Sequence, residues 1–190
     1  MVRLTGIARI EAGQIPLLAR PFYRGGDPGP IVGALAQVPE LLVAAMPFIG
    51  TALGPSGLDW RTKEIVIVRT SALAGCRFCV QSHAVVALDA GLTRDQVAAL
   101  QDPAAPPALL TAGFDTPREA TLIDWVDVVA GGGPVDDAAR ARVLTQWADH
   151  EVIELTAVVG TTLLLNRFAT ALALPTSSDV ITRLDREGLL

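Results

Sequence analysis

The sequence predicts an all-α protein, and three observations lead to that prediction. Helix-capping patterns recur along the chain, apolar residues repeat at helical spacing, and only one short segment favours a strand. The chain has 190 residues and no internal repeat or low-complexity tract. We therefore expect a single domain over residues 1–190, with its core at 58–100.

The first elements are defined by proline and glycine. Residues 24–30, RGGDPGP, are typical of a loop after a short N-terminal helix. Pro39 suits the first position of a helix that extends to about Leu53. Pro47 is expected to kink this helix, and the sequence GPSG at 54–57 ends it.

Capping residues define the middle of the chain. Asp59 is the predicted N-cap of a helix over 59–74, and Gly91 ends the helix that follows it. Two four-residue patterns, TRDQ at 93–96 and TPRE at 116–119, fit the capping box, in which Thr is followed three residues later by Gln or Glu. Each of them predicts the start of a helix.

Helical periodicity continues to the C-terminal part of the chain. After the second capping box, one apolar face consists of Leu122, Ile123, Val126, Val129 and Ala130. A further helix begins near Asp136, with Ala139, Val143 and Trp147 recurring every four residues. The last long helix, roughly 151–172, is apolar almost all round, so we expect it to be buried in the core or between subunits.

One segment favours a different fold. The run EIVIVRT at 64–70 is rich in β-branched residues and has strand propensity. A strand that leads to Cys-x-x-Cys at a helix start would suggest a thioredoxin fold. That fold needs several more strands, which the sequence does not offer. We therefore interpret 59–74 as a buried helix that tolerates Ile and Val.

Composition excludes several classes of protein. The net charge of −5 is mild and unclustered, which argues against nucleic acid or an anionic membrane as a partner. Two cysteines cannot form the disulfide framework of a secreted domain. The N-terminal residues contain no apolar signal core, and prolines and glycines interrupt the apolar run at 41–58. We expect a cytoplasmic protein whose high mean hydropathy, +0.43, indicates self-association as a homo-oligomer.

Reactive residues are concentrated in AGCRFCVQSH at 74–83. In a helix, Cys76, Cys79 and His83 share one face, and both cysteines lie in the first turn, where the helix dipole stabilises a thiolate. If the helices 59–74 and 76–90 are antiparallel, Glu64 and His83 differ in height by only ~3 Å and can face each other. Carboxylate, imidazole and two thiols therefore converge from two helices.

The pattern E-x11-C-x2-C-x3-H, formed by Glu64, Cys76, Cys79 and His83, resembles the motif of AhpD-like alkylhydroperoxidases in the carboxymuconolactone decarboxylase superfamily. Residues 58–100 are similar to the core of that family throughout, and 34–42 and 163–175 are similar to its flanking helices. The resemblance implies an all-helical, oligomeric, cytoplasmic protein with no metal or organic cofactor. It also implies a central antiparallel helix pair that carries the Cys-x-x-Cys site.

The resemblance implies a role for each residue of the motif. Cys79 would attack a hydroperoxide, and Cys76 would resolve the resulting sulfenic acid as a disulfide. A dithiol reductant would restore both thiols. His83 would be the base, in agreement with its position one turn from Cys79, and Glu64 would orient it. One position departs from the best-studied branch of the family, which has a second histidine where this chain has Phe78.

Structural interpretations compete with this one. Cys76, Cys79 and His83 supply three zinc ligands, and only Glu64 or the distant His150 could supply a fourth. The two thiols could also be inert and buried, and Glu64 could pair with Arg61 or Lys63. Four further side chains are interpreted as structural. His150 is isolated in the sequence, and Trp60, Trp125 and Trp147 suit the core. Arg69 is expected to form an ion pair within the fold or across an interface.

Three functions of different classes remain open. The first is a thiol-dependent peroxidase or related dithiol oxidoreductase that acts on hydroperoxides or other small molecules. The second is lactone chemistry of the carboxymuconolactone decarboxylase type, which would use Glu64 and His83 without the cysteines. The third is a non-catalytic, redox-sensitive oligomeric protein.

Overall fold

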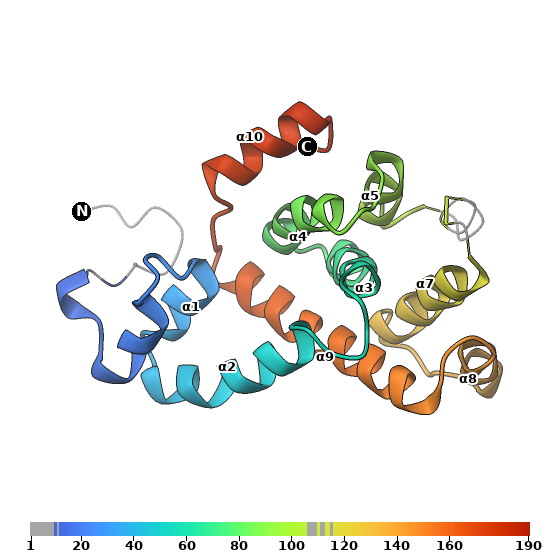
Figure 1. Cartoon of the computed structure of the whole chain (residues 1–190), viewed down its shortest axis with the longest axis horizontal. Coiled ribbons are helices and arrows are strands. Elements are labelled where there is room, and N and C mark those ends of the chain that lie inside the picture. Colours follow the sequence, from blue (N-terminus) through green and yellow to red (C-terminus); the bar gives the residue numbers. More distant parts are fainter. Residues whose placement is uncertain (1–9, 11, 106–109, 111–112, 115) are drawn as a thin grey trace.

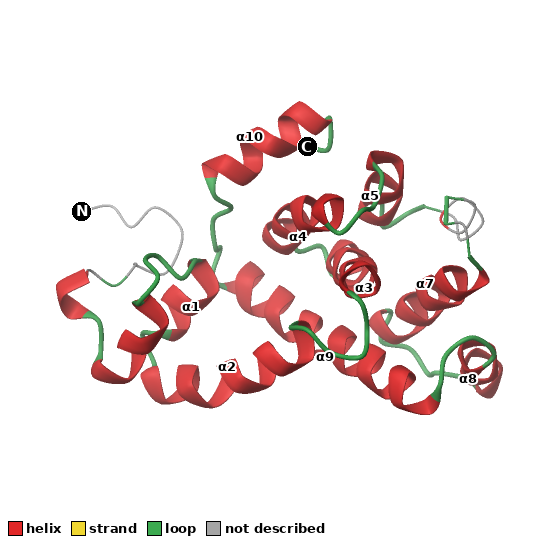
Figure 2. Ribbon diagram, viewed as in Figure 1, coloured by secondary structure: helices red, strands yellow, loops and turns green. Residues whose placement is uncertain are grey.

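The computed structural model describes residues 10, 12–105, 110, 113–114 and 116–190, and these residues form helices and no strands (Figure 2). The prediction of an all-α fold is confirmed. Two short 3-10 helices, η1 and η2, precede the α-helices. The elements are η1 (Ala12–Gln14), η2 (Leu17–Tyr23), α1 (Pro30–Leu35), α2 (Pro39–Leu53), α3 (Trp60–Leu73), α4 (Arg77–Asp89), α5 (Arg94–Gln101), α7 (Pro117–Ala130), α8 (Asp137–Leu144), α9 (Asp149–Ala171) and α10 (Ser178–Glu187).

Helix α3 lies at the centre of the molecule (Figure 1). It packs against α4, α5, α7 and α9, while α2 lies along α9 and α10 lies over α4. The two helices of the predicted pair, α3 and α4, are antiparallel neighbours. This arrangement places the start of α4 between α3 and α9.

The β-branched run at 64–70 is helical, and it is buried on every side. All residues from Thr62 to Ala72 of α3 are buried. β-Branched residues lose up to ~0.7 kcal/mol each in helix propensity, whereas fully burying Val or Ile contributes ~1.5–3 kcal/mol. Burial therefore outweighs the strand propensity, and the thioredoxin alternative is wrong.

The predicted caps position the ends of the helices. Asp59 Oδ1 accepts a hydrogen bond from the Thr62 N–H at 2.6 Å, and Thr93 forms a complete capping box with Gln96. Gly91, with φ of +89°, follows the end of α4 in the left-handed conformation that favours glycine. Thr116 caps the N–H of Glu119, but the Glu119 carboxylate pairs with Arg61 at 2.7 Å.

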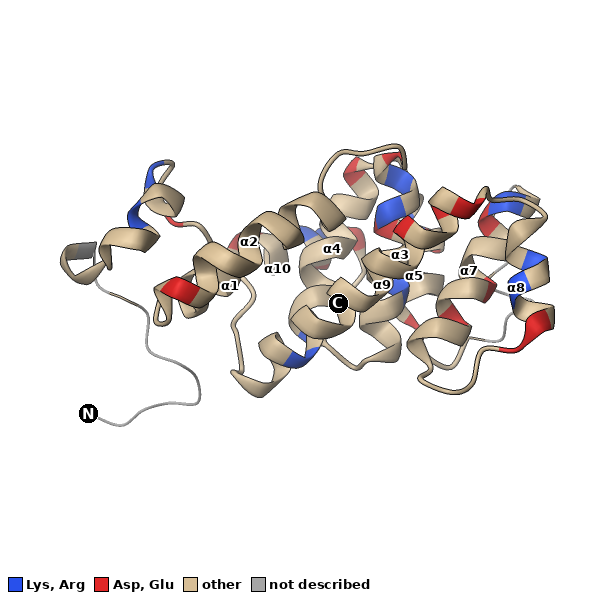
Figure 3. Cartoon of the chain, turned by 90° about the horizontal axis from the view of Figure 1, so that it is seen from below, with Lys and Arg blue, Asp and Glu red and all other residues tan. Residues whose placement is uncertain are grey.

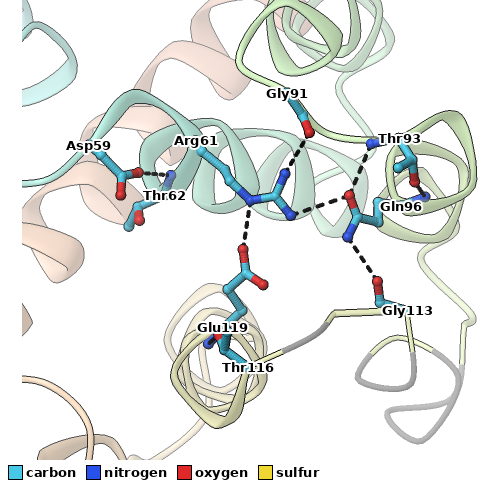
Figure 4. Close-up of polar contacts among 9 residues, drawn as sticks. All are labelled: Asp59, Arg61, Thr62, Gly91, Thr93, Gln96, Gly113, Thr116 and Glu119. Atoms are coloured by element: carbon cyan, nitrogen blue, oxygen red, sulfur yellow. Dashed lines mark hydrogen bonds and ion pairs between the residues drawn. The ribbon is translucent and has the colours of Figure 1, made fainter.

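Arg61 links α3 to three neighbouring segments (Figure 4). Besides Glu119 of α7, its guanidinium donates to the Gly91 carbonyl at 2.8 Å and to Gln96 Oε1 at 3.3 Å. Gln96 in turn donates to the Gly113 carbonyl at 2.8 Å. This network holds the first turn of α3 to α5, α7 and the segment after α4.

Two buried cations secure the remainder of α3. Lys63 Nζ donates to the carbonyls of Ala52 and Gly54 at the end of α2, at 3.0 and 2.6 Å, and pairs with Glu154 of α9 at 3.0 Å. Arg69 is bidentate to Asp127 of α7, with N–O distances of 2.7 and 2.9 Å. The expectation that Arg69 forms an ion pair within the fold is confirmed.

Helix α9 begins two residues before the predicted start and crosses the molecule beside α2, α3, α4 and α7. It is the one helix in the described residues that is long and apolar enough to span a membrane. Its inward face, which includes Leu155, Val158 and Val159, packs in the core, as is typical of a central helix in a soluble protein.

Candidate active site

The site begins at the turn between α3 and α4. Gly75 adopts φ of +66°, a conformation that glycine accepts at little cost, and Cys76 is the N-cap of α4. Because the turn reverses the chain, the first turns of α4 lie beside the last turns of α3. His83, two turns into α4, is thereby placed opposite Glu64, while Cys76 and Cys79 lie closer to the turn.

Glu64 and His83 form the predicted contact between the two helices. His83 Nδ1 lies 3.0 Å from Glu64 Oε2. The Glu64 side chain is 5% exposed, whereas that of His83 is 31% exposed. The buried carboxylate fixes the orientation of the ring and leaves its other nitrogen available for chemistry. The alternative of a surface pair with Arg61 or Lys63 is wrong.

The two cysteines are reduced, adjacent and buried. Cys76 is 0% exposed and Cys79 is 6% exposed. Cys76 Sγ accepts a hydrogen bond from the Cys79 N–H at an N–S distance of 3.4 Å. Ala169 of α9 packs against both. Helix α9 therefore covers the start of α4, and a reductant cannot reach Cys76 there.

The surroundings of the two thiols give them different pKa values. Hydrogen bonds from the side chain and N–H of Cys79, and from Thr170 and Asn166, outweigh burial and lower the pKa of Cys76 from 9.0 to about 6. The hydrogen bond to Cys76, burial and the Cys76 charge raise the pKa of Cys79 well above its ordinary range. The pair thus loses its first proton readily, and the charge resides on Cys76.

A cavity of about 50 Å³ gives access to Cys79 and His83, but Cys76 does not line it. Its apolar walls come from α1, the end of α2, α3, α4 and α9, and consist of Ile31, Leu53, Ile67, Phe78 and Leu165. A larger groove, of about 500 Å³, lies between α4, α5 and the C-terminus and contains none of the four predicted site residues.

The helices that build this site match known proteins. Residues 39–127, which include all four residues of the motif, match the carboxymuconolactone decarboxylase family. Over 91 residues the chain is 34% identical to the alkyl hydroperoxide reductase AhpD of Mycobacteroides abscessus. That match covers 47% of each protein, so the chain spans about half the length of this curated relative.

Solved structures share the fold over nearly the whole chain. An AhpD-core, peroxidase-related protein from Ralstonia eutropha superposes with a TM-score of 0.78 at 16% identity, covering 95% of this chain and 96% of that one. The debrominase Bmp8 superposes with a TM-score of 0.77 at 18% identity, covering 98% of each chain. The chain therefore has the all-α fold of these AhpD-like structures, and its residues 39–127 resemble the carboxymuconolactone decarboxylase family.

Within this fold, α9 contributes polar side chains that the sequence analysis did not identify. Asn166, which is 0% exposed, donates from Nδ2 to Ser71 Oγ of α3 at 3.0 Å and also hydrogen-bonds the two thiols. Thr162, Asn166 and Thr170 recur every four residues in the C-terminal half of this largely apolar helix. That recurrence of polar residues on one face was the available indication of a role near the site.

The remaining candidates lie away from the cavity. Trp125 and Trp147 are buried as expected, whereas Trp60 is 52% exposed at the start of α3, so its assignment to the core is wrong. His150 is exposed in the first turn of α9. In the described part of the chain, no group of three or more His, Cys, Asp or Glu side chains is arranged to hold a metal ion.

Proposed function

We propose that the chain is a thiol-dependent peroxidase, or a closely related dithiol oxidoreductase, that uses Cys79 and Cys76. The observation that carries the proposal is the position of Cys79. Cys79 and His83 both line the cavity, and Cys79 is also hydrogen-bonded to Cys76, whose pKa is lowered. Likeness to the AhpD of Mycobacteroides abscessus supports the same chemistry.

The first step oxidises Cys79. Its sulfur attacks the terminal oxygen of a hydroperoxide, the O–O bond breaks, and the Cys79 proton passes to the Cys76 thiolate, to which Cys79 is hydrogen-bonded. His83, oriented by Glu64, is the general acid that gives a proton to the departing alkoxide. The products are an alcohol, a Cys79 sulfenic acid and a Cys76 thiol. Cys76 thus takes part of the role that the sequence analysis gave to His83.

The second step restores the enzyme. Cys76 attacks the Cys79 sulfenic acid, a disulfide forms and water departs. A dithiol reductant then reduces this disulfide by thiol–disulfide exchange and becomes a disulfide itself. Because Cys79 lines the cavity and Cys76 does not, the reductant attacks the sulfur of Cys79. The good leaving group in that exchange is Cys76, because its pKa is lowered to about 6.

A turnover assay tests the proposal. The purified chain is incubated with tert-butyl hydroperoxide and dihydrolipoamide, and tert-butanol is measured for wild type, Cys76→Ser, Cys79→Ser and the double variant. Turnover that either substitution abolishes supports the proposal. Absence of turnover in the wild type would overturn it. Conversion of a lactone that survives the double substitution would instead favour decarboxylase-type chemistry by Glu64 and His83.

A second candidate is reductive dehalogenation. The apolar cavity walls favour it, together with the likeness to the debrominase Bmp8, a variant of which was solved with 2,3,4-tribromopyrrole. The two thiols would supply the electrons: an aryl bromide and two thiols would become the arene, hydrogen bromide and the Cys76–Cys79 disulfide. Release of bromide from tribromopyrrole by the wild type, but not by Cys79→Ser, would support this candidate.

A further inference from the structure

Three buried oxygen atoms have no hydrogen-bond partner among the described residues: Thr70 Oγ1, Thr162 Oγ1 and Asn166 Oδ1. Thr162 is 2% exposed and Asn166 is 0% exposed. Both of these residues line the 50 Å³ cavity beside Cys79 and His83, and Thr70 does not. Buried polar atoms are nearly always paired, so unpaired atoms in two residues that line one cavity point to a ligand that pairs with them.

The hydrogen-bonding capacity of the two atoms defines that ligand. Asn166 Nδ2 donates to Ser71 Oγ at 3.0 Å, which fixes the amide with Oδ1 as its unpaired end. Asn166 Oδ1 can only accept a hydrogen bond, whereas the Thr162 hydroxyl can donate one. A ligand that satisfies both needs an O–H donor directly beside an oxygen acceptor. The –O–OH group of a hydroperoxide has this pair on two bonded atoms.

The volume and walls of the cavity restrict the ligand further. A single water molecule needs about 10–15 Å³ of cavity volume, so 50 Å³ has room for only about three to five groups of that size, which limits the substrate to a small one. The neighbouring walls, which include Ile67, Phe78 and Leu165, are apolar. They suit an alkyl or aryl substituent, which hydrogen peroxide lacks.

We propose that Thr162 and Asn166 are substrate-binding residues that hold the –O–OH group of a small organic hydroperoxide against Cys79. The inference rests on the proposed peroxidase function and extends it to residues outside the four-residue motif. The hydroperoxide O–H donates to Asn166 Oδ1. The Thr162 hydroxyl donates to the other peroxide oxygen, on which negative charge develops as the O–O bond breaks.

Thr162 provides the cleaner test, because Asn166 also hydrogen-bonds the thiols. Thr162→Val keeps the shape of the side chain and removes the hydroxyl, while Thr162→Ser keeps the hydroxyl. Thr70→Val is the matched control, since it removes an unpaired buried hydroxyl that does not line the cavity. Circular dichroism and thermal unfolding verify that all three variants fold.

The readout is the second-order rate constant for oxidation by tert-butyl hydroperoxide, measured beside the rate of alkylation by iodoacetamide. Loss of one hydrogen bond in Thr162→Val should lower the oxidation rate constant about tenfold and leave alkylation unchanged. Thr162→Ser should retain most of the rate, and Thr70→Val should match wild type. Equal oxidation rates in Thr162→Val and wild type would overturn the inference and show that only water pairs with these atoms.

A binding measurement separates this inference from the proposed function. In the Cys79→Ser background the cavity has no thiol to oxidise, and ligand-observed NMR can detect tert-butyl hydroperoxide directly. Adding Thr162→Val should weaken that binding about tenfold. Wild type that binds the hydroperoxide in this way but does not reduce it would overturn the peroxidase alone. Equal binding of the hydroperoxide with and without Thr162→Val would overturn the inference.

Discussion

The Nδ1 atom of His83 and the Oε2 atom of Glu64 lie 3.0 Å apart, although the two residues are on different helices. The carboxylate is buried, and the imidazole extends from it toward the cavity that Cys79 lines. A carboxylate in this position fixes the orientation of the ring for proton transfer. The contact therefore holds the cavity-lining imidazole of His83 to a carboxylate in the core.

Replacing Glu64 should impair that proton transfer. In Glu64→Gln the shape is retained but the charge is lost, so we expect oxidation by tert-butyl hydroperoxide to slow by ~10²-fold, and likewise in His83→Ala. Stopped-flow fluorescence can follow the reaction. Glu119→Gln is the control, because its ion pair with Arg61 lies outside the cavity and its loss should leave the rate unchanged. An unaltered rate in Glu64→Gln would remove both residues from the mechanism.

The order of the cysteines gives a second prediction. Cys79 lines the cavity and Cys76 does not, so the sulfenic acid should form on Cys79. In Cys76→Ser, a sulfenic acid on Cys79 should accumulate and be trapped by dimedone, as detected by mass spectrometry. In Cys79→Ser, little should form on Cys76. Trapping on Cys76 at the wild-type rate would reverse the assigned roles.

Much of the fold and of this site could be predicted from the sequence, because local rules determine them. Asp59 and Thr93 begin their helices as short-range capping predicts. The contact between Glu64 and His83 could be predicted from helix geometry, because the number of residues from each of them to the turn gives its height along the helix pair. The run at 64–70 was correctly interpreted as a helix, because the sequence has no other strand-like segments that could pair with it in a thioredoxin sheet.

The failures share one cause, which is long-range packing. Asn166 contacts Ser71 across 95 positions of sequence, and no local pattern predicts that pairing. The same helix covers Cys76 at the N-cap of α4, and no local pattern predicts that burial. At the start of α3, the Trp60 side chain remains exposed even though the residues that follow it are in the core. Neighbours distant in sequence decide burial in each case.

The pH dependence of the thiols follows from their shifted acidities. Because the pKa of Cys76 is lowered to about 6, its thiolate should be present above that pH and lost below it. The raised pKa of Cys79 keeps the second thiol protonated. The ultraviolet absorbance of thiolate should therefore rise through about pH 6 by one thiolate per chain. The step should disappear in Cys76→Ser, and a step near the ordinary value of 9.0 in wild type would contradict the assignment.

Arg69 should be essential for stability. Its side chain is 2% exposed and pairs with Asp127, so Arg69→Met leaves a partly buried carboxylate without its cation. We expect the free energy of unfolding to fall by about 3 kcal/mol in urea titrations. Arg140→Met removes an exposed pair with Asp137 and should change it by less than ~0.5 kcal/mol. Similar losses in both variants would show that burial does not determine the effect.

Self-association is expected to involve the outer face of α9. Ile153 and Leu164 are 70% and 57% exposed and lie three turns apart on that face, and charged side chains are sparse along α2 and the middle of α9 (Figure 3). Light scattering should detect a dimer or larger oligomer that Leu164→Glu dissociates. Leu144→Glu, an equivalent change on α8, should not dissociate it. A wild-type monomer at micromolar concentration would contradict this prediction.

The central claim is that a hydroperoxide oxidises Cys79 and that Cys76 completes a reversible disulfide. Its most direct test treats the reduced chain with one equivalent of tert-butyl hydroperoxide and no reductant. Intact-mass and peptide mass spectrometry then record the state of both cysteines. We predict loss of two hydrogens per chain, a Cys76–Cys79 disulfide, one equivalent of tert-butanol, and full reversal by dihydrolipoamide. Cysteines that remain as two free thiols, with the hydroperoxide unconsumed, would contradict the account.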